Sequence, residues 1–240
     1  AEAFYAQIDY SLNDKTTITA GIRETDEKKD GFKTYSAFGV SASSTADFSN
    51  TSTTFIVSHQ LTDNTNVYAK LAEGFKGGGF NAEEQVDFAT FQLKDGFKAY
   101  APETVESTEF GFKGVYLDNR LAVNFAYFMN EHTDMQVAYF TAAGAASSEV
   151  LNASAEIDGM ELEIQAYLSD TSRLNINFGY LDIGGYTGNN VAGDGFSLEA
   201  FPYSPQDTVF LTYEKDFANF TLRLDHEHVS EHYAFPYNSK

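Results

Sequence analysis

Five short Asp-bearing turns recur about every fifty residues along this chain of 240 residues. They are centred on Asp14, Asp63, Asp118, Asp170 and Asp216. Between successive turns lie two stretches in which apolar and polar residues alternate, joined by a longer connection that is often rich in Gly and Ser. Because alternation with a period of two is typical of half-buried strands, the pattern predicts ten antiparallel strands in meander order. All five tight turns should lie at one end of the sheet and the large loops at the other, as in outer-membrane β-barrels.

The alternation also assigns a face to each side chain. Apolar residues occupy one parity of every stretch, and we expect this face to contact lipid, because a bilayer accepts apolar side chains while Arg or Lys near its midplane costs ~2–4 kcal/mol. The predicted lipid-facing residues are Ile18, Ile22, Val123, Phe125, Leu162, Ile164, Leu174, Ile176, Leu222 and Leu224. Polar residues of the opposite parity should face the concave side, namely Arg23, Asn124, Glu163, Asn175 and Arg223.

Charge and composition exclude several classes of function. Asp and Glu number 35 against 15 Lys and Arg, and the net charge of −20 disfavours nucleic acid as a partner. The chain has no cysteine, which excludes disulfides, thiolate metal sites and a Cys nucleophile. The longest apolar run, Phe125–Met129, is far too short for a transmembrane helix. A mean hydropathy of −0.33 suits a soluble protein, but only alternate strand residues of a membrane barrel face lipid.

A large soluble β-sandwich or solenoid is the alternative that this pattern leaves open. Charged residues in the middle of the polar face suit either a wet lumen or a solvated sheet. The predicted strands are about ten residues long, as tilted barrel strands are, whereas globular strands usually have about five or six. Aromatic residues also gather near the strand ends, as in an aromatic girdle: Tyr5, Tyr10, Tyr68, Tyr116, Tyr139, Phe140, Tyr167, Tyr180 and Phe217. Together these observations favour the membrane barrel.

Several segments resemble strand motifs of TonB-dependent outer-membrane receptors. The segment Val67–Asn81 is similar to that family's "YA…EGFK-GGFN" strand and loop, and Pro102–Gly114 to its "PET-x-x-S-x-E-x-G-x-K" strand. Further similar segments are Ala20–Lys28, Arg120–Gln136, Ile157–Glu163 and Ser204–Asp207. Each motif is weak alone, but they occur in order and at plausible spacing over nearly the whole chain.

The resemblance implies an all-β fold, an antiparallel meander of about ten strands that forms part of a larger transmembrane barrel. An intact receptor of this kind would lie in the Gram-negative outer membrane and capture a scarce ligand, most often a ferric siderophore. Uptake would be energised through the TonB complex by way of a plug domain, with no catalysis and no cofactor. The strand motifs are shared by siderophore, cobalamin, haem and oligosaccharide receptors, so they leave the ligand open. A passive porin or a structural outer-membrane barrel is the alternative function, and a soluble extracellular β-protein the third.

The ends of the chain lack features of a complete receptor. We find no signal peptide or TonB-coupling box near Ala1, and the chain stops at Lys240 in what resembles an extracellular loop. We therefore expect residues 1–240 to be a partial receptor barrel, without the plug domain and the C-terminal strands.

Aromatic residues in two large loops are the predicted ligand-binding candidates. Aromatic rings at the mouth of a barrel can stack on a siderophore's aromatic groups or on sugar rings. Packing of the loops against each other is the alternative, and we favour it because aromatic residues mostly serve packing. The candidates are Phe80, Phe88, Phe91, Phe97, Tyr100, Tyr186, Phe196, Phe201 and Tyr203.

Two segments match the sequence pattern of a metal or phosphate site but lack the secondary structure that such a site requires. The segment His226–His232 fits a zinc pattern that requires a helix, but it continues a predicted strand on which His226 and His228 share a face and His232 does not join them. The segment Gly74–Gly79 lacks the helix and the Ser or Thr of a phosphate-binding loop. We predict no metal site in the first, and in the second a flexible exit whose glycines permit positive φ.

Overall fold

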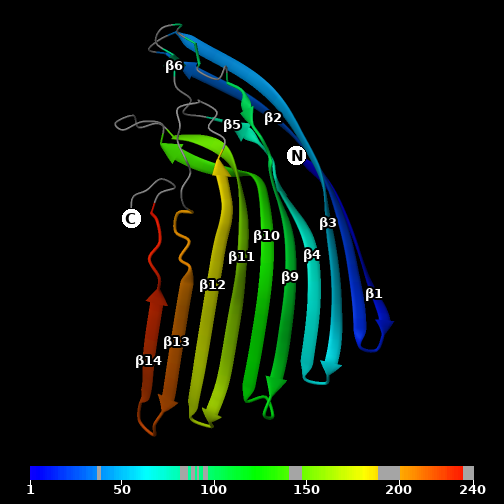
Figure 1. Cartoon of the computed structure of the whole chain (residues 1–240), viewed down its shortest axis with the longest axis vertical. Coiled ribbons are helices and arrows are strands. Elements are labelled where there is room, and N and C mark those ends of the chain that lie inside the picture. The colour runs from blue at the N-terminus through cyan, green and yellow to red at the C-terminus, as the bar shows by residue number, and fades with distance from the viewer. Residues whose placement is uncertain are drawn as a thin grey trace.

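The protein forms one large antiparallel sheet (Figure 1). The computed structural model describes residues 1–36, 39–81, 86–87, 90, 92–93, 97–140, 148–188 and 201–234. Ten long strands pair in the order β1-β2-β3-β4-β9-β10-β11-β12-β13-β14, so each pairs with the long strands before and after it. They are β1 Glu2–Asn13, β2 Thr16–Tyr35, β3 Val40–Thr62, β4 Thr65–Lys76, β9 Glu103–Tyr116, β10 Leu121–Phe140, β11 Ser148–Ser169, β12 Ser172–Gly188, β13 Asp207–Asp216 and β14 Thr221–Val229. This confirms the predicted open meander, with β1 and β14 at its edges.

The connection between β4 and β9 contains short strands that the sequence did not predict. They form two small two-stranded sheets, in which β5 (Gly79–Phe80) pairs with β8 (Ala99–Tyr100) and β6 (Val86–Asp87) pairs with β7 (Gln92–Leu93). Two-residue strands are too short to show an alternation.

Within the described ranges, no helix is long and apolar enough to cross a membrane.

The five short turns lie at one end of the sheet, as predicted, and the long connections lie at the other (Figure 1). Local chemistry shapes these turns. The backbone amide of Lys15 donates to Asn13 Oδ1 at 2.9 Å, an Asx turn. In the turn between β9 and β10, Leu117, Asp118 and Asn119 have φ of 53°, 54° and 66°. Asp and Asn tolerate this left-handed conformation better than most residues, which explains their presence in this turn.

The strand register places the predicted apolar residues on one face of the sheet. Val123 of β10 lies opposite Ile164 of β11, which lies opposite Ile176 of β12 and then Leu211 of β13. Directly opposed residues share a face, so these side chains form a continuous row. The apolar face is largely uncovered, with Leu224 54% exposed. The predicted set therefore forms an open apolar surface, as expected of a lipid-facing band.

The opposite face, which we call the polar face, carries hydrogen-bonded polar side chains. Tyr68 donates its hydroxyl to Glu109 Oε1 at 2.5 Å, and Lys70 Nζ lies 3.3 Å from Glu109 Oε2. The Tyr68 ring covers Gly111, where an added Cβ would lie 2.0 Å from it, and Lys113 Nζ lies 5.7 Å from the ring centroid. Lateral pairing of this kind stabilises charges on a half-exposed surface.

Four of the strands are about twice as long as predicted. The structure gives 20 residues for β2, 23 for β3, 20 for β10 and 22 for β11. The exposed apolar face covers only the half next to the short turns, while the far halves remain hydrogen-bonded and carry the small buried clusters of the structure, which include Phe48, Met135, Val137 and Leu151. A row of directly opposed glutamates marks where the apolar face ends on four adjacent strands: Glu73, Glu106, Glu131 and Glu156.

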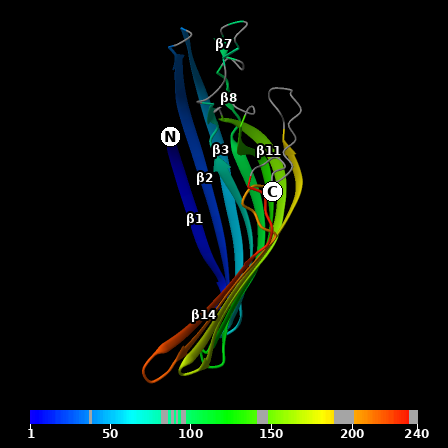
Figure 2. The ribbon, with the colours of Figure 1, turned by 90° about the vertical axis from the view of Figure 1, so that its left-hand side faces the viewer.

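The sheet parts between β3 and β4 in this polar half. Their pairing ends at Thr54 and Ala72, beyond which β3 pairs with β2 while β4 pairs with β9 as far as Lys76. We call this opening the seam. Figure 2 shows the far ends of β2 and β3 rising apart from the other strands. The seam positions the cavity described next.

Candidate ligand cavity

Two short segments cross the polar face at the seam, and we call them together the strap. They are Gly77–Asn81, which follows β4, and Phe97–Pro102, which precedes β9. The two segments pair with each other, because Gly79 and Phe80 of β5 form a ladder with Ala99 and Tyr100 of β8.

Side-chain amides attach the strap to β11. Asn81 accepts the backbone N–H of Val150 at 2.7 Å and donates to its carbonyl at 3.3 Å. In the same way, Asn152 accepts the N–H of Ala101 at 2.9 Å and donates to its carbonyl at 3.1 Å. In each pair an asparagine side chain replaces the peptide group that a neighbouring strand would supply, so the strap is attached to β11 without a backbone ladder between them.

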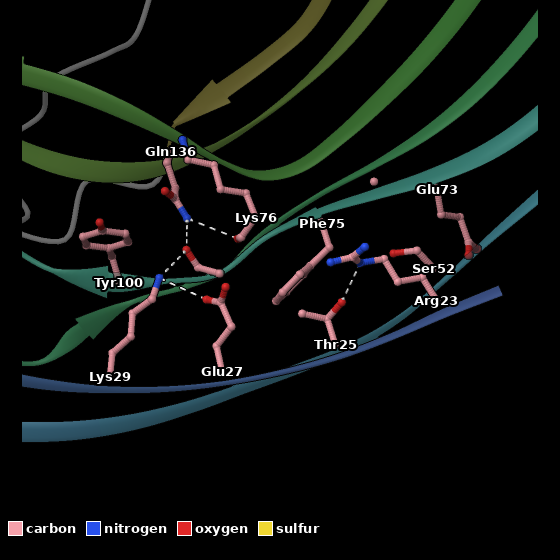
Figure 3. Close-up of a pocket in the computed structure, with 12 residues that line it drawn as sticks. Arg23, Thr25, Glu27, Lys29, Ser52, Glu73, Phe75, Lys76, Tyr100 and Gln136 are labelled. Atoms are coloured by element: carbon pink, nitrogen blue, oxygen red, sulfur yellow. Dashed lines mark hydrogen bonds and ion pairs between the residues drawn. The ribbon is translucent and has the colours of Figure 1, made fainter. Parts of the chain in front are cut away.

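The other side of the strap contacts β2 and β3. Lys29 Nζ donates to the Gly78 carbonyl at 2.7 Å, while Asn81 binds Val150 of β11. The strands β2 and β11 are five intervals apart in the sheet, which on a flat sheet is ~24 Å. The strap nevertheless contacts both of these strands, and Figure 3 shows strands of the sheet on the two sides of the site, so the sheet curls around the strap. The polar face is therefore the concave one, as predicted.

A cavity of about 550 Å³ lies at the seam beside the strap (Figure 3). Its walls come from β2, β3, β4, β10 and the strap itself. The lining residues are Arg23, Thr25, Glu27, Lys29, Ser52, Glu73, Gly74, Phe75, Lys76, Gly77, Tyr100 and Gln136. Residues far apart in sequence thus share one site because the meander brings their strands together.

Three cationic side chains line this cavity in a chain whose net charge is −20. Lys29 Nζ lies 3.1 Å from Glu27 Oε2, and Lys76 Nζ lies 3.7 Å from a carboxylate oxygen of Glu103. Arg23 differs from both, since its Nε donates to the Thr25 hydroxyl at 3.1 Å. No carboxylate of the described residues forms an ion pair with Arg23. Its guanidinium is therefore the cation with donors available to a ligand oxygen.

The glycines of the strap let its backbone lie close to neighbouring residues. The prediction that the glycines of Gly74–Gly79 adopt positive φ is wrong. Among the described glycines, Gly39 is the one with positive φ. A Cβ added at Gly77 would lie 2.0 Å from the Glu27 carboxylate, and one at Gly78 would lie 2.3 Å from the Tyr100 carbonyl oxygen. These glycines let the strap lie directly against its neighbours.

Two of the predicted ligand-binding aromatics pack the strap onto the sheet. The rings of Phe80 and Phe97 stack with centroids 5.2 Å apart. Phe97 is 3% exposed and packs against β2 and β3, so it is part of a core and not of the cavity. Tyr100 does line the cavity.

The other aromatic candidates lie away from the cavity or outside the part of the chain that the structure describes. Phe201 packs against a small core made by Met135, Val137 and Ala153. Tyr203 is 72% exposed, with its ring 6.2 Å from that of His232. Outside the described residues or side chains lie Phe88, Phe91, Phe196 and the Tyr186 side chain.

The polar residues of the cavity were not among the predicted binding residues. The sequence predicts Arg23 only as a polar residue of the concave face, it places Lys76 and Gln136 in segments similar to receptor motifs, and it does not single out Lys29. Their spacing carries a partial indication, since Arg23 and Lys29 share the parity of the concave face. No local pattern indicates that β4 leaves β3 beside them.

The histidine segment is arranged as its strand assignment predicted. His226 and His228 share the apolar face of β14, opposite Leu211 and Val209, and β14 ends at Val229, before His232.

A family model described as "TonB dependent receptor-like, beta-barrel" matches residues 1–240. The chain belongs to the TonB-dependent receptor family. Members of this family are transporters of the Gram-negative outer membrane, and not enzymes.

Solved receptors share the fold of this TonB-dependent receptor barrel. The ferric yersiniabactin uptake receptor FyuA from Yersinia pestis matches with a TM-score of 0.75 and 19% identity, over 98% of this chain and 34% of that one. The copper transporter OprC matches with a TM-score of 0.67 and 16% identity, over 91% of this chain and 33% of that one. The ferric-catecholate import receptor Fiu from E. coli matches with a TM-score of 0.63 and 16% identity, over 95% of this chain and 35% of that one. The chain thus spans about a third of the length of these receptors.

Proposed function

We propose that this barrel wall belongs to a receptor that takes up an anionic ferric chelate, of the siderophore type, from outside the cell. The concave face, the strap and the seam cavity form the part of the ligand path that this chain contributes. Uptake is energised through TonB by way of a plug domain, which we expect elsewhere in the receptor. In this receptor, residues 1–240 act as part of the barrel wall.

The observation that carries the proposal is the Arg23 guanidinium in the cavity. Arg presents several N–H donors in a planar fork that matches carboxylate and other paired oxygens. Lys29 and Lys76 add positive charge within the same cavity. An anionic chelate gains from all three cations, and Phe75 and Tyr100 offer rings against which its aromatic groups can stack.

The charge of the cavity also separates the ligands named by the similar structures. FyuA and Fiu are receptors for ferric chelates by description, whereas OprC transports copper. A free copper cation would be repelled by Arg23, whose charge no carboxylate of the described residues neutralises, whereas Glu27 neutralises Lys29. An anionic chelate would be attracted by Arg23, and this favours the siderophore class.

The test is a binding assay with the full-length receptor in detergent, using chelates that differ in charge. We expect an anionic ferric tris-catecholate to bind more tightly than a neutral ferric trihydroxamate. Arg23→Gln should weaken tris-catecholate binding about tenfold or more, because a hydrogen bond to a charged group is lost.

Arg223→Gln is the matched control. Arg223 lies on the same face near the short turns, where its Nε already pairs with Asp225 at 2.9 Å, and its removal should leave binding unchanged. Equal affinity for the two chelates, or an Arg23→Gln variant that binds like the wild type, would overturn the proposal.

A further inference from the structure

Lys29 binds the strap and also lines the cavity. Its ammonium donates to the Gly78 carbonyl at 2.7 Å and lies 3.5 Å from the Gly77 carbonyl, so it holds the first segment of the strap. The same side chain lines the cavity, where Figure 3 shows it beside Glu27 and Tyr100. A ligand oxygen in the cavity would compete with the strap for this one ammonium.

Gln136 holds the strap from the opposite side of the site. Its Nε2 donates to the Gly77 carbonyl at 3.1 Å and lies 3.3 Å from the Ala101 carbonyl. Gln136 comes from β10 and Lys29 from β2, so the strap is clamped between strands on the two sides of the seam. The two contacts are unequal, since the amide is neutral and the ammonium is charged.

Glu27 makes the Lys29 contact sensitive to a ligand. Its Oε2 atom is buried without a hydrogen bond and lies 3.1 Å from Lys29 Nζ. The same oxygen would lie 2.0 Å from a Cβ added at Gly77, so it is packed directly against the strap. If Lys29 moves toward a ligand, the half-buried carboxylate of Glu27 beside Gly77 loses its nearest cation. Because an unpaired buried charge is costly, the arrangement of the strap around Glu27 becomes less favourable.

We propose that Lys29 couples occupancy of the cavity to release of the strap. The inference rests on the proposed function, in that the occupant is an anionic chelate. When the chelate binds, the Lys29 ammonium exchanges the Gly78 carbonyl for a ligand oxygen. The segment Gly77–Asn81 then keeps its side-chain hydrogen bonds to β10 and β11, its ladder to β8 and the Phe80–Phe97 stack, but it loses its charged contact with β2, and the strap loosens on that side of the seam.

The test is amide hydrogen exchange over residues 77–81, measured by mass spectrometry on the full-length receptor in nanodiscs. Without ligand, Lys29→Met should raise exchange in this segment about tenfold, because the hydrogen bond from a charged donor is lost. Lys28→Met is the matched control. Lys28 is the neighbouring lysine on the opposite face of β2, and its variant should exchange like the wild type.

The second arm adds the ferric tris-catecholate as probe. Exchange over residues 77–81 should rise in the wild type and rise no further in Lys29→Met. Binding of the chelate without any change in exchange would overturn the coupling and leave the proposed function intact. Failure of the chelate to bind would overturn the proposed function, and the ligand-free comparison would still show whether Lys29 holds the strap. Wild-type exchange in ligand-free Lys29→Met would overturn the inference by itself.

Discussion

Glu73 of β4 substitutes for a missing strand next to Thr53 of β3. Its Oε2 accepts hydrogen bonds from both the backbone N–H and the hydroxyl of Thr53, each at 2.8 Å. Thr53 is the first residue of β3 beyond the ladder with β4, so this carboxylate closes the start of the seam. The bond therefore fixes where the barrel wall parts.

Removal of that carboxylate should loosen the seam. We expect Glu73→Ala to destabilise the full-length receptor by about 1–3 kcal/mol, because the Thr53 amide loses its partner and its hydroxyl loses an acceptor. The measurement is the urea midpoint in detergent, together with amide exchange around Thr53. Glu106→Ala is the control, since Glu106 lies directly opposite Glu73 in the glutamate row. Equal effects of the two variants would show that Glu73 acts only through its charge.

The glutamate row itself should be electrostatically unfavourable. Glu131 lies between Glu106 and Glu156 on adjacent strands, with all three side chains on one face. Like charges directly opposite each other are destabilising, by roughly 0.2–1 kcal/mol per pair. Glu131→Gln should therefore stabilise the receptor by an amount of that order at low ionic strength, and less in high salt. A lower urea midpoint for Glu131→Gln at low salt would contradict this.

The long meander, its turns and its two faces could be predicted because each rests on local sequence. Alternation assigns Ile18 and Ile22 to one face and Arg23 to the other without any tertiary information. Asp and Asn mark the turns because of their own backbone preferences. These features agree with the family motifs, which are themselves strand patterns.

The cavity could not be predicted, because it depends on contacts between distant residues. Lys28 and Lys29 are adjacent and chemically identical, yet only Lys29 reaches the strap. Asn81 and Asn152 resemble ordinary loop and strand residues until the sheet curls and brings β11 to the strap. Phe97 was a ligand candidate by composition, but burial against β2 and β3 gives it a packing role.

Substitution of Gly78 should displace the strap without removing any polar contact. A Cβ at this position would lie 2.3 Å from the Tyr100 carbonyl oxygen and 2.5 Å from the Phe48 ring. Overpacking of this kind costs about 1–3 kcal/mol. Gly78→Ala should therefore speed amide exchange over residues 77–81. At Gly184 the structure shows no atom within 4 Å of an added Cβ. Gly184→Ala is therefore the control, and it should leave amide exchange over residues 77–81 unchanged.

The 240-residue chain expressed alone should not be soluble without detergent. Its apolar face is open, with Phe4 77% exposed and Ile8 70% exposed on β1, and β1 and β14 each leave one edge unpaired. Unpaired edges next to apolar surface promote aggregation in water, and lipid does not accept an open sheet edge. We expect inclusion bodies, and heat-modifiable folding in detergent only for the full-length receptor, as judged by gel mobility with and without boiling. A monodisperse β-rich product at neutral pH without detergent would contradict the assignment of the apolar face to lipid.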